Sequence, residues 1–199
     1  MTTFEDLPLE LRSMILQEWL DGLFKRHQMS TGLHWDHFVI RWRSSNHSYR
    51  TYAEARRTIT SRRDAAATTI KDVFDAFPAG SPTILEFARL INNDLARLQD
   101  KGRAACAQAE ALRSAYWRPG NTLQESMDAV MNWSACLAEI SILEWSCNTL
   151  EMGLGVEKSQ WTRFQVHDIA SDARNPVTLS VLDTAMRSSV LLEGELLDR

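Results

Sequence analysis

A regular seam of apolar and small residues over residues 82–116 limits the possible folds of this chain more than any other feature. These residues recur at alternating steps of four and three, which places them along one side of an α-helix. A helix of this length would span roughly 50 Å and would not be stable alone in water. The seam keeps its phase through Gly102, so a continuous helix is expected, with a close neighbour at the glycine. We therefore predict a long central helix in a bundle, with the seam formed by Ile84, Ala88, Ile91, Leu95, Leu98, Gly102, Ala105, Ala109, Leu112 and Tyr116.

Two further long helices are expected beside this one. Residues 49–77 carry an apolar stripe that ends at Pro78, and a helix from Asn121 to Gly153 is apolar on most sides, which is typical of a central helix. Asn121 and Gln124 are spaced as in a capping box, and a terminal helix is predicted after Pro176. The predicted fold class is all-α, an antiparallel bundle of three long helices plus a C-terminal helix over residues 49–199. A short helical N-terminal module over residues 1–48 precedes it.

The composition is that of an ordinary globular protein, with 44% hydrophobic and 24% charged residues. No apolar run has the length of a membrane span, and the N-terminus lacks a secretory signal, so no membrane association and a cytoplasmic or nuclear location are expected. Cys106, Cys136 and Cys147 lack metal or redox spacing and are interpreted as small core residues. The sequence contains no glycine-rich phosphate loop and no nucleophile elbow. We therefore predict no cofactor, no metal site and no catalytic residue.

Residues 4–23 predict an amphipathic helix at the start of the chain. Pro8 suits the first turn, and Glu5, Asp6 and Glu10 complement the positive helix end. The apolar stripe of this helix consists of Leu11, Ile15, Leu16, Trp19, Leu20 and Leu23. The segment Leu7-Pro8-Leu9-Glu10-Leu11, followed by Ile15-Leu16 and Leu20, resembles the start of an F-box. The segment Val39-Ile40-Arg41-Trp42-Arg43 is similar to the second half of that motif.

The resemblance covers residues 4–43 and implies a helical module that docks on a Skp1-type adaptor. The rest of the chain would then capture a substrate for ubiquitin ligation. The residues that would face the adaptor are Leu7, Pro8, Leu11, Ile15 and Leu16. We therefore predict a non-enzymatic protein–protein interaction protein. A helix that merely packs on the bundle would bury the same stripe, so the exposure of Leu11 and Ile15 distinguishes the two interpretations.

A basic segment over residues 41–63 supports an alternative function, nucleic-acid binding. It carries a local charge of +6, although the whole chain has a net charge of −4. Arginine pairs with phosphate bidentately, and the interleaved Trp42, Tyr49 and Tyr52 could stack on bases. A solvated helix face would show the same pattern. The candidate residues are Arg41, Arg43, Arg50, Arg56, Arg57, Arg62 and Arg63.

A third alternative is a helical-bundle enzyme or metal-binding protein. Glu144 lies on the apolar face of the third long helix, where a carboxylate needs a partner such as Arg62, or protonation. His34 and His37 form an i, i+3 pair that could supply two metal ligands. Two histidines do not complete a metal site, and a catalytic glutamate would need a second acid or base beside it.

Overall fold

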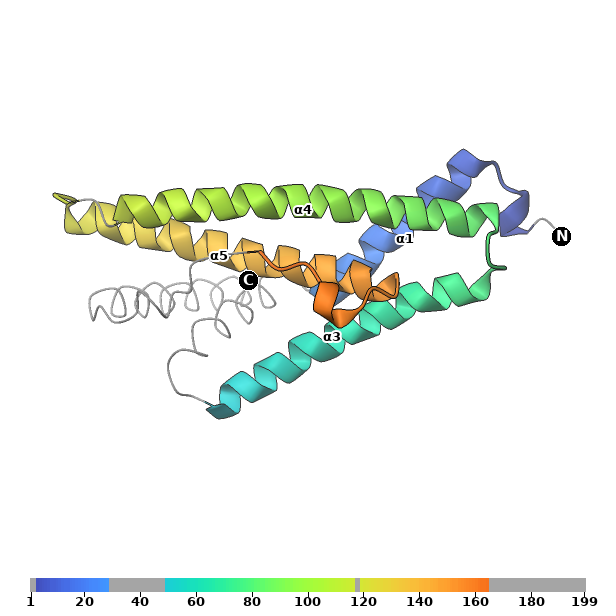
Figure 1. The fold of residues 1–199 in the computed structure, drawn as a ribbon, viewed down its shortest axis with the longest axis horizontal. Helices are drawn as coiled ribbons and strands as arrows, with labels where there is room; N and C mark the ends of the chain where they lie inside the picture. The colour runs from blue at the N-terminus through green and yellow to red at the C-terminus, as the bar shows by residue number, and fades with distance from the viewer. Residues whose placement is uncertain (1–2, 29–48, 117–118, 165–199) are drawn as a thin grey trace, which may run out of the picture.

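The computed structural model describes residues 3–28, 49–116 and 119–164. Every regular element in these ranges is helical, as predicted (Figure 1). The predicted C-terminal helix after Pro176 lies outside the described residues. The elements are the short 3₁₀ helix η1 (Phe4–Asp6), α1 (Leu9–Gln28), α3 (Tyr49–Ala76), α4 (Pro82–Tyr116), α5 (Leu123–Gly153) and the 3₁₀ helix η2 (Lys158–Gln160).

The helices α4 and α5 form a long antiparallel pair, and α1 and α3 pack on it toward the end where α4 begins (Figure 1). The core lies where these four helices meet, and α5 supplies its two fully buried tryptophans, Trp133 and Trp145. The indole nitrogen of Trp145 donates a hydrogen bond to the Ile59 carbonyl of α3 at 3.3 Å. The other largest fully buried side chains are Phe87, Leu20, Leu23, Ile70, Ile91, Ile140 and Leu150.

The first helix shares this core rather than lying apart from it. Leu16, Leu20 and Leu23 of α1 are buried in the same cluster as Ile70 of α3 and Phe87 of α4. Trp19 meets the Phe87 ring edge-on, with the ring centroids 5.7 Å apart. Four of the six residues of the predicted apolar stripe of α1 therefore face the bundle.

The start of α5 differs from the sequence prediction by one residue. The N-cap is Thr122, whose hydroxyl accepts the Glu125 amide at 3.2 Å, while the Glu125 carboxylate accepts the Thr122 amide at 2.8 Å. This reciprocal capping box forms between a hydroxyl and a carboxylate, whereas Asn121 donates from its side-chain amide to the Ala115 carbonyl of α4. The prediction that Asn121 and Gln124 form the capping box was wrong, because the Asn121 side chain caps the end of α4 instead.

Beyond α5 the chain returns along α4 and α5 as a strap, which we define as residues 156–164. Its last described residue, Phe164, packs on Gly102, and a Cβ atom at Gly102 would lie 2.0 Å from Phe164 Cζ. The helix α4 is continuous through Gly102, as the seam predicted. The absence of a side chain there lets an aromatic ring contact the helix surface directly.

Candidate functional site

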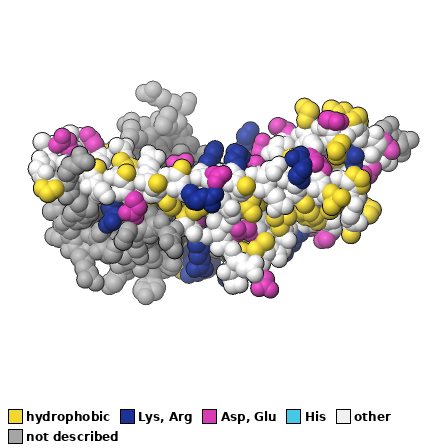
Figure 2. All heavy atoms as spheres, turned by 45° about the horizontal axis from the view of Figure 1, so that its top comes forward, with side chains coloured by type: hydrophobic (Ala, Val, Ile, Leu, Met, Phe, Trp, Pro, Cys, Tyr) yellow, Lys and Arg dark blue, Asp and Glu magenta, His cyan; other side chains and the backbone are white. Residues whose placement is uncertain are grey.

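One side of α1 exposes large apolar side chains to solvent. Leu11 and Ile15 are 46% and 48% exposed, and Met14 is 67% exposed. An α-helix advances about 100° per residue, which places these three residues on the side opposite Leu16 and Leu20. Leu9 in the first turn is also exposed, at 45%. Leu9 lies on the side of Leu16 and Leu20, so we call Leu11, Met14 and Ile15 the α1 patch. In Figure 2, hydrophobic side chains gather over the end of the molecule where α1 begins.

The residues predicted to face a partner divide between this patch and the core. Leu11 and Ile15 belong to the patch, Pro8 is exposed beside it, and Leu7 is half-buried. Leu16 is only 6% exposed and packs in the core. Leu16 therefore cannot present its side chain to a partner while α1 stays packed. The sequence interpretation did not include Met14, although its position along the helix places it outside the buried stripe.

A row of polar contacts joins α1 to α4 beside the apolar core. The Arg12 guanidinium is buried and donates to Glu5 at 2.9 Å and to the Thr83 hydroxyl at 2.8 Å. One and a half turns later, the Gln17 side-chain amide donates to Asp94 at 3.1 Å. Directional contacts at successive turns fix the rotation of a helix about its axis. The side of α1 that faces solvent is therefore set by this row.

The central member of the row is Glu86, a buried carboxylate of α4. It accepts a hydrogen bond from the Ser13 hydroxyl of α1, and Arg89 Nε donates to it at 2.7 Å. The hydrogen bond from Arg89 lowers the pKa of Glu86 from 4.5 to about 2, against the opposing effect of burial. Glu86 is therefore ionised at neutral pH and holds both Ser13 and Arg89.

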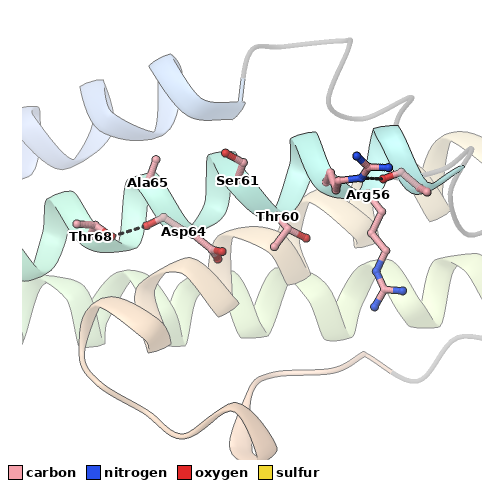
Figure 3. A pocket seen from close by; sticks show the side chains of 8 residues that line it. Arg56, Thr60, Ser61, Asp64, Ala65 and Thr68 are labelled. Carbon is pink, nitrogen blue, oxygen red and sulfur yellow. Dashed lines mark hydrogen bonds between the residues drawn. The ribbon is translucent and has the colours of Figure 1, made fainter. Parts of the chain in front are cut away.

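The basic segment is only partly accessible. Arg56 and Arg57 are exposed on α3 and line a groove of about 810 Å³, together with Thr60, Ser61 and Thr68. Figure 3 shows Arg56, Thr60, Ser61 and Thr68 among the side chains that line this groove along α3. Arg62 and Arg63 are half-buried. Arg50 lies in the first turn of α3, in a part whose side chains the structure does not describe, and Arg41 and Arg43 lie outside the described residues.

Arg63 is held by two neighbours. Its guanidinium donates to Asp64 at 2.9 and 3.1 Å and lies 4.7 Å from the centre of the Trp161 ring of the strap. This ion pair also neutralises Asp64, the acid that lines the groove. The structure therefore leaves Arg56 and Arg57 as the exposed basic pair of the predicted segment within the described side chains.

Glu144 acts as an acceptor for the strap. Its carboxylate accepts the main-chain amide of Phe164 at 2.9 Å, and the buried Glu151 accepts the Thr162 amide at 2.7 Å. The Thr162 hydroxyl also donates to Glu151 and accepts from Gln99 of α4 at 3.2 Å. Both carboxylates therefore anchor the main chain of the strap to α5.

The remaining candidates for chemistry do not form a centre within the described residues. His34 and His37 lie outside them. Within the part of the chain that the structure describes, no three histidine, cysteine, aspartate or glutamate side chains are grouped as metal ligands. Burial raises the pKa of Cys147 to about 12 and also raises that of Cys136. A groove of about 260 Å³ lies between α1, α4 and α5 near Phe24, Asp94 and Ser146.

No family model, curated protein or solved structure matches this chain. In the described ranges, no helix combines the length and the apolar character needed to cross a bilayer.

Proposed function

We propose that this protein is a non-enzymatic interaction protein that docks through the α1 patch on a Skp1-type adaptor, in the manner of an F-box-like protein. The observation that carries the proposal is the solvent exposure of Leu11 and Ile15. A helix that merely packed on the bundle would bury these side chains. Grouped exposed apolar side chains on one helix face are typical of a protein-binding surface.

The exposure of the patch does not arise from a loosely attached helix. Leu16, Leu20 and Leu23 are buried on the opposite side, and the polar row from Arg12 to Gln17 fixes the rotation of α1. A helix anchored in this way presents its outer face without a conformational change, so little entropy is lost there on binding. Preorganised apolar anchors of this kind suit a helix that docks into a groove.

The spacing of the patch also fits such docking. Within α1, Leu11 is followed by Met14 and Ile15 at three and four residues. Anchors at these intervals lie on one face and enter a single groove of a partner. The bundle that remains exposed beyond α1 would supply a second surface for a substrate.

The test is the affinity of the full-length chain for a recombinant Skp1-type adaptor. We compare the parent with a Leu11→Gln/Ile15→Gln variant, which removes two anchors without adding charge and keeps good helix formers. The matched control is Leu85→Gln/Met131→Gln, because Leu85 and Met131 are similarly exposed but lie on α4 and α5. Two lost anchors of about 1–2 kcal/mol each should weaken binding by at least about thirtyfold.

The control should bind like the parent, and circular dichroism should show that all three proteins are folded. A folded parent that does not bind the adaptor would overturn the proposal. An anchor variant that binds as tightly as the parent would also overturn it, because the patch would then not be the docking surface.

A second candidate function, nucleic-acid binding, is favoured by one observation on α3. Arg56 and Arg57 are adjacent and exposed beside hydroxyls, and Arg63 neutralises the nearby Asp64. Fluorescence anisotropy with a single-stranded oligonucleotide tests this candidate. Affinity should fall steeply with salt and be reduced in Arg56→Gln/Arg57→Gln, but not in Arg103→Gln, an exposed arginine paired with Asp100 on α4. Equal, salt-insensitive binding by all three proteins would remove this candidate.

A further inference from the structure

We infer that the partner of the α1 patch has an apolar groove rimmed by basic side chains. This inference rests on the proposed function and adds the chemistry of the partner. It comes from the charges that surround the patch. Residues 3–21 contain five acids, Glu5, Asp6, Glu10, Glu18 and Asp21, all of them exposed.

The stretch of α1 that carries the patch presents no free positive charge. The one basic residue between positions 3 and 21 is Arg12, which is buried and pairs with Glu5. The other lysine and arginine residues of α1, Lys25 and Arg26, lie in its last turn. The helix therefore has an acidic first half, which carries the patch, and a basic end.

The neighbouring helix does not compensate for these acids. Arg89 and Arg97 of α4 are both more than half exposed, but each pairs with a buried carboxylate. Arg89 pairs with Glu86, and Arg97 pairs with Asp94 at 2.8 Å. Each pair is electrically neutral as a unit. The negative charge around the patch is therefore carried by Asp6, Glu10, Glu18 and Asp21.

The geometry places acids at the edge of the apolar surface rather than across its centre. By helical position, Glu10 and Asp21 lie along one flank of the patch, and Glu18 follows Ile15 in the next turn. Figure 2 shows acidic and hydrophobic side chains together over this end of the molecule. Apolar anchors with a charged rim are the common plan of a protein interface. Complementary potentials then require a basic rim on the partner.

The two kinds of residue should affect different rate constants. Charges at the rim of an interface mainly speed the encounter of the partners, whereas buried apolar anchors slow their dissociation. Removal of the acids should thus lower the association rate constant. Removal of Leu11 and Ile15 should instead raise the dissociation rate constant.

The experiment measures both rate constants for the full-length chain and the recombinant Skp1-type adaptor. The proteins are the parent, Glu10→Gln/Glu18→Gln, and the control Glu139→Gln/Glu157→Gln, whose glutamates are exposed on α5 and beyond it. Salt is varied from about 50 mM to about 500 mM, which shortens the range of electrostatic attraction severalfold. The parent should associate about tenfold more slowly at high salt. Glu10→Gln/Glu18→Gln should associate several times more slowly at low salt and respond less to salt, while the control follows the parent.

Each other outcome overturns the inference. If the adaptor binds the parent but the Glu10→Gln/Glu18→Gln variant associates at the same rate, the rim charges are irrelevant and the proposed function stands without them. If that variant associates faster, the partner carries acidic rather than basic groups. If the parent does not bind the adaptor, the proposed function and this inference fail together.

Discussion

At the scale of single residues, Glu86 shows how one buried carboxylate links two helices. It is 8% exposed, yet it is ionised, since Arg89 and Ser13 donate to it from different helices. A buried charge is tolerated only with such compensation. The polar part of the α1–α4 contact therefore depends on a few atoms that must all be correctly placed.

The pKa of Glu86 leads to a pH-dependent prediction. Because the folded-state pKa of about 2 lies below the ordinary value of 4.5, ionised Glu86 stabilises the folded protein above pH 4.5. This stabilisation is lost as the pH falls from 4.5 toward 2. Its partner Arg89 is more than half exposed, so solvent screening reduces the effect, and Glu86→Gln should cost about 1–2 kcal/mol at neutral pH.

Urea unfolding at several pH values checks this prediction. The difference in unfolding free energy between the parent and Glu86→Gln should shrink between about pH 5 and about pH 2. Glu139→Gln, an exposed glutamate of α5, is the control and should change stability by less than about 0.5 kcal/mol. A constant difference over the whole pH range would contradict the assignment.

At the scale of elements, α1 belongs to the bundle by its packing. Its buried leucines lie in the same core as α3, α4 and α5, and Phe24 meets Trp145 of α5 with ring centroids 6.2 Å apart. The sequence prediction divided the chain after residue 48, and that division remains a prediction. What the structure adds is that the candidate docking face and the bundle share one rigid helix.

The strap is a second element whose position depends on side chains far away in the sequence. Glu151 and Glu144 accept its amides, and Gly102 leaves room for Phe164. Replacing Gly102 by alanine has two opposing effects. Alanine favours the helix by up to about 1 kcal/mol, but its Cβ displaces the Phe164 ring, and lost burial of that ring costs about 1.5–3 kcal/mol when the burial is complete.

We therefore predict that the sign of the Gly102→Ala effect depends on Phe164. In the parent, the substitution should lower the unfolding free energy by about 1 kcal/mol, since Phe164 is only partly buried. In a Phe164→Ala background, the same substitution should raise it by about 0.5–1 kcal/mol. Urea unfolding of the four proteins measures this cycle. Two changes of equal sign and size would show that the ring does not pack on Gly102 in solution.

At the scale of the whole molecule, the shared core predicts cooperative protection of α5. Cys147 is fully buried within α5, and burial raises its pKa to about 12. Cys106 on α4 is half-buried. A thiol buried in a shared core becomes reactive only when the core opens.

Thiol labelling followed by peptide mapping tests this cooperativity. Under native conditions, Cys106 should be modified first, and Cys147 should react at least about a hundredfold more slowly. Added urea should accelerate the modification of Cys147 in parallel with global unfolding. Labelling of Cys147 as fast as Cys106 in native buffer would mean that α5 opens locally and that the core is not a single cooperative unit.

The sequence alone determined the class of the fold and the positions of its long helices. The seam predicted α4 from Pro82 to Tyr116, and the stripe over residues 49–77 predicted α3, which ends at Ala76. The apolar character of residues 121–153 predicted a central helix, and six apolar side chains of α5 are buried: Val130, Trp133, Leu137, Ile140, Cys147 and Leu150. These features were predictable because helical periodicity and end signals are local in the sequence.

Which side of each helix meets a neighbour and which meets solvent became known only from the folded chain. The stripe of α1 appeared as one apolar set, but Leu16 and Leu20 are buried while Leu11 and Ile15 are exposed. Contacts to Thr83, Glu86 and Asp94, more than seventy residues away in the chain, set this division. Likewise, Glu144 of α5 accepts a hydrogen bond from the strap only because the chain folds back onto α4 and α5. Rotation of a helix and contacts between distant segments depend on packing of the whole chain, which local periodicity does not specify.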